Sequence, residues 1–250
     1  MKLEWRFDTE DIKRVRDLVE RMSGDFLVQY RIARNVTREK AVDLTPEVAW
    51  HALCACRLTS QQRSGPTAPV NVFLLRKPFP LALQFLRHAY SAEESIRSAL
   101  VKAGGIRFSN QIAKDLDRIF QELEGGDWRL LLDLLEGLRE GPGKEAERSA
   151  AAWIQHYPGF GMKQSRNLLQ MLGLTRSEIP LDSRIAKWLK ENGFTFPLDA
   201  NLLATQSYYL LIMDCVQDLC EKAEVHPCVF DAAVFASFDA GRWNETNLIW

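Results

Sequence analysis

Apolar residues recur along the chain at the spacing of helix faces, and no segment alternates apolar and polar residues in the manner of a half-buried β-strand. In residues 4–35, for example, Ile12, Val15, Leu18 and Met22 fall on one stripe, and the basic residues lie elsewhere. The pattern predicts an all-α fold. The helical segments that it predicts are 4–35, 46–58, 71–90, 91–102, 106–123, 127–140, 146–156, 162–172, 183–192, 202–225 and 230–238.

Several predicted boundaries coincide with residues that start or stop helices. Thr45 followed by Pro46 opens one helix with an N-cap and a proline at its first position. Pro78 and Pro80 divide segment 71–90 into two short helices or a helix and a turn, because proline interrupts a helix. Residues 141–143, with the sequence Gly-Pro-Gly, form the clearest hinge of the chain.

The turn Pro158-Gly159-Phe160-Gly161 separates the helical patterns at 146–156 and 162–172, which predicts a helix-hairpin-helix. Pro158 ends the first helix, and the two glycines allow a tight backbone and the close approach of another group. Phe160 is expected to pack inward. The turn presents a helix N-terminus, whose free N–H groups and positive dipole end suit a phosphate. The alternative is a turn that only joins two helices.

Lys163 and Asp182 are candidate catalytic residues near this turn. Lys163 falls in the first turn of its helix, where burial and the helix dipole disfavour the charged amine, and a neutral lysine amine can form a Schiff base. Asp182 follows nineteen positions later, just before the helix at 183–192, where a carboxylate can stabilise positive charge or move protons. The alternatives are a solvated lysine and a helix N-cap.

The string Pro158-Gly159-Phe160-Gly161-Met162-Lys163, followed at this interval by Asp182, resembles the helix-hairpin-helix DNA glycosylase superfamily. The lysine marks its bifunctional branch, and the resemblance is closest to the 8-oxoguanine DNA glycosylase/AP lyases. It covers about residues 50–250 and is strongest at 157–189. The resemblance implies that Lys163 attacks the sugar C1′ and that Asp182 assists expulsion of the base. It also implies that double-stranded DNA with an oxidised base is the partner, contacted at Gly159, Gly161 and Arg166.

The polar stretch 58–66 after the helix at 46–58 acquires a role through the same resemblance. In such glycosylases a short polar segment fills the space that the extruded nucleotide leaves, which offsets part of the cost of flipping. Gln61 or Gln62 would be the filler, and Arg63 would contact a phosphate. A simple polar loop is the alternative. The string 105–108, Gly-Ile-Arg-Phe, also recurs in the 8-oxoguanine branch.

The resemblance further implies a base pocket and two helical domains. Phe230, Asp231, Phe235 and Trp250, near the C-terminal end, are candidates for stacking on the base or bonding to it, and a core or tail role is the alternative for each. Residues 51–155 would form a helical barrel domain. Residues 1–50 and 156–250 would together form the second domain, with the hairpin at the cleft between the two.

The net charge of −1 alone argues weakly against a DNA-binding protein, but the charges are unevenly distributed along the chain. Residues 57–107 hold eight Lys and Arg against two Asp and Glu, whereas the last sixty residues hold two against nine. One basic face would suit DNA, because phosphate contacts need only local positive potential, although chance blockiness is the alternative. Neither a membrane-spanning run nor a signal peptide is predicted, so a cytoplasmic, nucleoid-associated location is expected. The protein is also expected to be a monomer.

The five cysteines are expected to be reduced core residues, since they are too few and too irregular for a disulfide framework. Some relatives hold an iron–sulfur cluster on four C-terminal cysteines. This chain has three there, so no cluster is expected. Cys215, Cys220, His226 and Cys228 leave a zinc site as an alternative. The chemistry requires no cofactor or catalytic metal, and backbone carbonyls around Gly159 and Gly161 would be the place for a monovalent cation.

These observations favour a bifunctional DNA glycosylase/AP lyase that removes an oxidised purine, 8-oxoguanine in the first place. Two alternatives stay open. An endonuclease III-like enzyme would act on oxidised pyrimidines, and the missing fourth cysteine counts against it. A non-catalytic DNA-binding protein would use the hairpin for phosphate contact alone, and would have no reason to place Lys163 and Asp182 at this interval.

Overall fold

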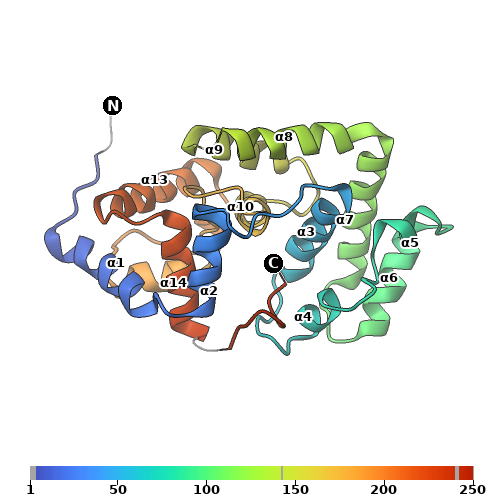
Figure 1. Ribbon diagram of the computed structural model, residues 1–250, viewed down its shortest axis with the longest axis horizontal. Helices are drawn as coiled ribbons and strands as arrows, with labels where there is room; N and C mark the ends of the chain where they lie inside the picture. The colour runs from blue at the N-terminus through green and yellow to red at the C-terminus, as the bar shows by residue number, and fades with distance from the viewer. Residues whose placement is uncertain (1–3, 142, 240–241, 250) are drawn as a thin grey trace.

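The computed structural model describes residues 4–141, 143–239 and 242–249, and every regular element in these ranges is a helix, so the all-α prediction is confirmed (Figure 1). The α-helices are α1 Thr9–Met22, α2 Phe26–Arg31, α3 Pro46–Thr59, α4 Pro69–Leu74, α5 Leu83–Arg87, α6 Ala92–Ala103, α7 Ser109–Glu122, α8 Trp128–Glu140, α9 Lys144–Ile154, α10 Met162–Met171, α11 Ser183–Glu191, α12 Ala200–Leu203, α13 Gln206–Lys222 and α14 Pro227–Asp239. Short π-helical turns follow α2 at Ile32–Val36 and α7 at Leu123–Asp127.

The helices enclose two clusters of buried apolar side chains. The first cluster is built mainly from α3, α6, α7, α8, α9 and α10, and includes Leu53, Leu116 and Leu135. The second is built mainly from α1, α11, α13 and α14, and includes Leu18, Ile212 and Val234. In Figure 1 the blue and red helices of the second cluster lie on one side, the blue-green to green helices of the first lie on the other, and α10 lies between them.

The division between these cores differs in one respect from the predicted domain boundary after residue 155. Helix α10 packs on α3 and α9, and its Leu168 and Leu169 are buried in the first core. The hairpin therefore belongs to the first core by packing, while the segment that follows α10 leads into the second core at Ile179. Lys163 lies on α10, before this segment, and Asp182 lies at its end.

Some helix limits differ from the pattern-based prediction for local reasons. The helix expected from residue 106 begins at Ser109. Phe108 takes a left-handed conformation with φ 61°, so it cannot be part of the right-handed helix. The segment at 202–225 splits into α12 and α13, with Thr205 in extended conformation between them. Of the predicted hinge at 141–143, Pro142 lies outside the described residues.

The last described residues, 242–249, return to the first core, where they pass close to α4 (Figure 1). Asn71 of α4 donates its amide hydrogen to the carbonyl oxygen of Asn247, at 2.9 Å, and Ile249 packs against the first core. None of the described helices combines the length and the apolar composition that crossing a bilayer requires.

Candidate active site

The hairpin turn between α9 and α10 uses its two glycines in different ways. Gly159 has φ +82°, and a Cβ added there would lie 2.4 Å from Arg57 Nε and 3.1 Å from Asp115 Oδ2, so only glycine fits. Gly161, the N-cap of α10, is exposed, and an added Cβ would meet nothing within 4 Å. Phe160 is buried, as expected. The group that approaches Gly159 closely is thus a side chain of the chain itself, and the open side is at Gly161.

A buried ion pair beneath the turn connects it to the first core. Arg57 of α3 donates from Nε to Asp115 Oδ2 of α7 at 2.7 Å, and Nη2 lies 2.6 Å from the same oxygen. Gln111 donates to the other carboxylate oxygen at 2.8 Å. The sequence pattern did not reveal this pair, because its members are far apart in the chain and neither belongs to a motif.

Lys163 is the second residue of α10 and its side chain is exposed, so the predicted burial is wrong. Among the described residues, no group lies close enough to the Lys163 amine for a hydrogen bond or an ion pair. No side chain caps the first N–H groups of α10. Its positive charge acts on the neighbouring Cys56 thiol, whose pKa burial raises and Lys163 lowers. The amine is therefore available at the surface, beside a helix N-terminus that suits an anion.

Asp182 is the N-cap of α11, and one of its two carboxylate oxygens serves that purpose. Oδ1 accepts hydrogen bonds from the backbone N–H groups of Arg184 and Ile185 at 2.8 and 3.0 Å. Oδ2 lies 3.4 Å from Arg184 Nη1, and the side chain is 14% exposed. The capping alternative is thus present in the structure, and the second oxygen, which does not cap the helix, is paired with Arg184.

Arg184 joins Asp182 to the opposite side of the site. Its Nη2 donates to Ser64 Oγ, in the loop after α3, at 2.6 Å and to Asp239 Oδ2 of α14 at 2.9 Å. The guanidinium lies 4.1 Å from the ring centroid of Phe235, which is partly buried beneath it. Sequence reasoning assigned Arg184 no role, although its position two residues after Asp182 was a signal.

A small pocket lies between α2, α3 and α10 and is lined by Arg31, Cys56, Thr59, Asn167, Gln170 and Met171. Asp231 lies behind Gln170, whose Nε2 donates to Asp231 Oδ2 at 2.6 Å. Gln170 Oε1 is buried and has no hydrogen-bond partner in the described part of the protein. A ligand N–H group that entered this pocket would satisfy it, and leaving such an acceptor unpaired is costly.

The ionisation of Asp231 connects the pocket to both candidate catalytic residues. Burial raises the pKa of Asp231 to about 6; the charges of Arg31 and Lys163 and the hydrogen bond from Gln170 lower it, while the charge of Asp182 raises it further. The charges of Lys163 and Asp182 therefore act in opposite directions on the pKa of this one carboxyl.

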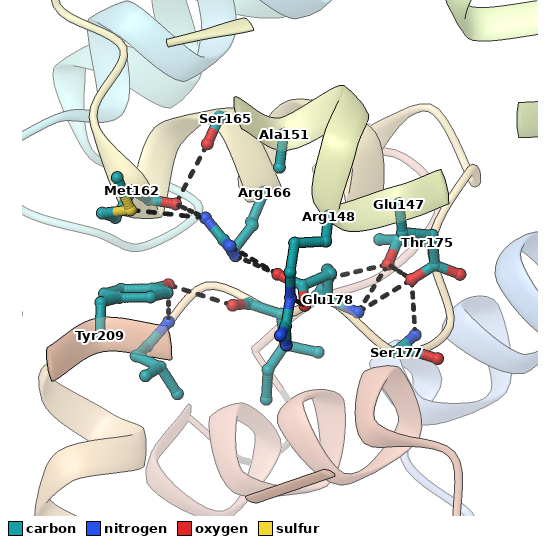
Figure 2. Close-up of polar contacts among 12 residues, drawn as sticks. Glu147, Arg148, Ala151, Met162, Ser165, Arg166, Thr175, Ser177, Glu178 and Tyr209 are labelled. Carbon is teal, nitrogen blue, oxygen red and sulfur yellow. Dashed lines mark hydrogen bonds and ion pairs between the residues drawn. The ribbon is translucent and has the colours of Figure 1, made fainter. Parts of the chain in front are cut away.

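Two of the expected site residues are buried away from any ligand, and these predictions are wrong. Arg166, expected to contact DNA, is 1% exposed, and its Nε donates to Glu178 at 2.6 Å (Figure 2). Phe230, expected to stack on the base, is 0% exposed and packs edge-on against Trp188 in the second core. Trp250 lies outside the described residues.

The polar loop after α3 is hydrogen-bonded to the segment before α7. The side-chain amide of Gln62 donates to the carbonyl of Arg107 at 2.8 Å and accepts from its N–H at 3.1 Å, so Gln62 is engaged in holding the loop. Gln61, with φ 56°, and Arg63 are exposed. The guanidinium of Arg107 lies over the ring of Phe108, which is 49% exposed. Of the two glutamines, Gln61 is therefore the one free to enter a duplex.

The cysteines are free thiols inside the two cores, as expected. No three His, Cys, Asp or Glu side chains among the described residues come together in a way that would hold a metal ion, so Cys215, Cys220, His226 and Cys228 do not form the alternative zinc site.

Comparison with models of protein families gives no match, and comparison with curated proteins gives none either. Solved structures do share the fold. The 8-oxoguanine DNA glycosylase of Methanocaldococcus jannaschii superposes with a TM-score of 0.66 at 17% identity, over 93% of this chain and 95% of that one. The 8-oxoguanine glycosylase/lyase of that organism, in complex with a 15mer DNA containing 8-oxoguanine, gives 0.67 at 16% identity, over 92% and 100%.

The 8-oxoguanine DNA glycosylase of Thermotoga maritima is similar to the same degree, with a TM-score of 0.67 at 17% identity over 93% of this chain and 98% of that one. At this level of identity the likeness establishes the fold. It confirms that the chain has the architecture of 8-oxoguanine DNA glycosylases, as the resemblance around Lys163 implied.

Proposed function

We propose that this chain is a bifunctional DNA glycosylase/AP lyase that excises an oxidised purine, with 8-oxoguanine as the lesion. The observations that carry the proposal are the exposed amine of Lys163 at a helix N-terminus that no side chain caps and the partly exposed carboxylate of Asp182, the two residues that the motif pairs. The shared fold supports it, since one of the similar proteins was crystallised with DNA containing 8-oxoguanine. Binding to chromosomal DNA would place the protein at the nucleoid.

DNA binding begins at the hairpin in this proposal. The open face at Gly161 and the free N–H groups of α10 receive a backbone phosphate, which positions the duplex without reading its sequence. The damaged nucleotide rotates out of the stack toward the pocket, and Gln61 occupies part of the space it leaves. Arg63 and Arg107 supply positive charge along the same edge.

The chemistry follows from the two oxygens of Asp182 and the amine of Lys163. Oδ1 holds the start of α11, while Oδ2 stabilises the positive charge that develops on the sugar as its bond to the base breaks. Lys163 reacts as the amine, so its ammonium group first gives a proton to the solvent. The amine then forms a bond to C1′ as the bond to the base breaks, and the proton released in this step balances the proton that the departing base takes up. Opening of the sugar gives an imine, which permits loss of a C2′ proton and expulsion of the 3′ phosphate.

Recognition of the base is assigned to the pocket beside Gln170, whose volume of about 30 Å³ leaves room for a polar group at the edge of the base and not for the whole ring system. The unpaired Oε1 of Gln170 accepts a hydrogen bond from an N–H group of the base, and Asp231 holds the amide in this orientation from behind. 8-Oxoguanine carries an N–H at N7 where guanine has an acceptor, so an acceptor in the pocket distinguishes the two.

A cofactor is not needed for this course. If a monovalent cation binds the hairpin, the carbonyl of Gly159 is better suited than that of Gly161, which already accepts two hydrogen bonds from Ser165.

Release of the free base under single-turnover conditions tests the proposal. Duplexes that carry 8-oxoguanine, thymine glycol or no lesion are incubated with excess protein, and the free bases are identified by mass spectrometry. Release of 8-oxoguanine alone is expected. Release of thymine glycol alone would replace the purine by an oxidised pyrimidine, and tight binding without release would reduce the protein to a DNA-binding module.

A further inference from the structure

The segment between α10 and α11 has no regular structure, and yet its residues 174, 175 and 178–181 are buried. Buried backbone groups need partners, because water is not available to them. This segment connects the helix that carries Lys163 to Asp182, so whatever supplies these partners also determines where the two residues lie relative to each other.

Glu147 of α9 holds the first part of the segment. Its carboxylate accepts hydrogen bonds from the backbone N–H groups of Ser177 and Glu178 at 2.8 and 2.9 Å (Figure 2). The N–H group of Arg176 donates to the other carboxylate oxygen at 3.0 Å. The hydroxyl of Thr175 donates to the carboxylate as well, at 2.5 Å. One buried carboxylate thus satisfies three consecutive N–H groups.

Glu178 connects the segment to the helix of Lys163. Its carboxylate lies 2.5 Å from Arg166 Nη2 of α10 and accepts from Arg148 Nε of α9 at 2.8 Å. Gln217 of α13 donates to it at 3.0 Å. Figure 2 shows the carboxylate between the two guanidinium groups. Arg166 stands three residues after Lys163 and Glu178 four residues before Asp182, so this ion pair links the two parts of the chain that carry the candidate catalytic residues.

Tyr209 of α13 holds the last residues before Asp182. Its hydroxyl donates to the carbonyl of Ile179 at 3.1 Å and accepts from the N–H of Leu181 at 2.8 Å. Its ring lies beneath the guanidinium of Arg166, 4.7 Å from the centroid. The side chain is 1% exposed, so no solvent can replace it.

We infer that Tyr209 and Glu178 are positioning residues, which act on the reaction through Asp182. A buried ion pair contributes little net stability, because desolvation of the charges offsets their attraction. The effect of the ion pair on geometry is larger here, since it fixes the position of Asp182 relative to Lys163. A displacement of about 1 Å can slow a reaction roughly a hundredfold. The inference rests on the proposed function, because it assigns Asp182 to base release.

The test compares Tyr209→Phe with Tyr208→Phe. Both remove one hydroxyl from α13, but that of Tyr208 donates to the carbonyl of Pro197 at an exposed position, whereas that of Tyr209 bonds to Ile179 and Leu181. Two rates are measured for each variant: release of 8-oxoguanine under single-turnover conditions, and strand cleavage of a duplex with a preformed abasic site. Tyr209→Phe is expected to slow base release roughly tenfold to a hundredfold. Cleavage at the abasic site, which needs no base release, stays close to wild type, and Tyr208→Phe changes neither rate.

A double-mutant cycle separates positioning from general stabilisation. In an Asp182→Asn background, Tyr209→Phe is expected to add no further loss of base release, because it acts through the carboxylate. Equal loss in both backgrounds, or equal loss of both activities, would overturn the inference. Glu178→Gln provides a second variant should Tyr209→Phe fail to fold, with the same expected pattern. A wild-type protein that releases no base from any duplex would refute the proposed function itself, an outcome distinct from an active wild type with an unaffected Tyr209→Phe.

Discussion

Replacing each hairpin glycine by alanine should separate the stability of the turn from its contact with DNA. In Gly159→Ala the new Cβ would lie 2.4 Å from Arg57 Nε and 2.6 Å from Arg57 Cδ, so the guanidinium has to leave its place beside Asp115. The left-handed backbone, with φ +82°, adds a strain of about 1–2 kcal/mol for a residue with a side chain.

The size of the effect follows from these two contributions. Removing one partner of a buried ion pair costs about 3–5 kcal/mol. Arg57 is displaced and not removed, so a fraction of that cost is expected, and the total loss should be about 2 kcal/mol or more. For a domain of this size that corresponds to a fall in Tm of at least roughly 4–8 °C.

Thermal and urea unfolding measure this loss, and Gly161→Ala is the matched control. Its Cβ meets nothing within 4 Å and its φ is −90°, so its loss of stability should not exceed the cost of about 1 kcal/mol that alanine has at an N-cap. Its affinity for duplex DNA should fall, because the methyl group occupies the face where the phosphate approaches. Equal stability of Gly159→Ala and wild type, or an equal loss in both variants, would refute this reasoning.

Three further changes address the site. Asp182→Asn should slow base release with little change in Tm, because asparagine is as good an N-cap as aspartate; a large fall in Tm with normal activity per folded molecule would leave only the capping role. Gln170→Leu should reduce the preference for 8-oxoguanine while cleavage at a preformed abasic site persists; an unchanged preference would move base recognition elsewhere. The pKa of Asp231 is raised by burial to about 6, so the folded state binds its proton more tightly than the unfolded state, and the stability contributed by protonation is lost as pH rises from about 4 to about 6. The free energy lost over this range is at most ~3 kcal/mol, the equivalent of a rise in pKa from 3.8 to about 6. Asp231→Asn should flatten this fall in Tm measurements across that range, and parallel pH profiles of the two proteins would contradict it.

The helices and the hairpin could be predicted from the sequence because their signals are local. Apolar spacing, the Thr45–Pro46 start and the Pro158–Gly161 turn lie within a few residues of the structure that they determine. Lys163 and Asp182 became candidates through their interval and their resemblance to a known motif. The fold then brought both within electrostatic reach of Asp231.

The errors concern side chains whose surroundings come from distant parts of the chain. Arg166 follows Lys163 on the same helix and could equally have faced solvent, but it pairs with Glu178 of a segment that no periodicity describes. Phe230 lies on a helix that is apolar on most sides, so the pattern does not tell which face meets a ligand and which meets Trp188. The sequence also left Gln61 and Gln62 as equal candidates, because the contact that engages Gln62 comes from Arg107, 45 positions away.

Borohydride trapping tests the central claim most directly, because borohydride reduces a lysine Schiff base to a stable covalent link. Wild type and Lys163→Gln are each incubated with duplexes that carry 8-oxoguanine, thymine glycol, an abasic site or no lesion. The account predicts a covalent complex on the 8-oxoguanine and abasic duplexes, its absence in Lys163→Gln, and retained affinity of that variant for damaged DNA. A complex that persists in Lys163→Gln, or no complex on any duplex despite tight binding, would contradict the assignment of Lys163 as the nucleophile.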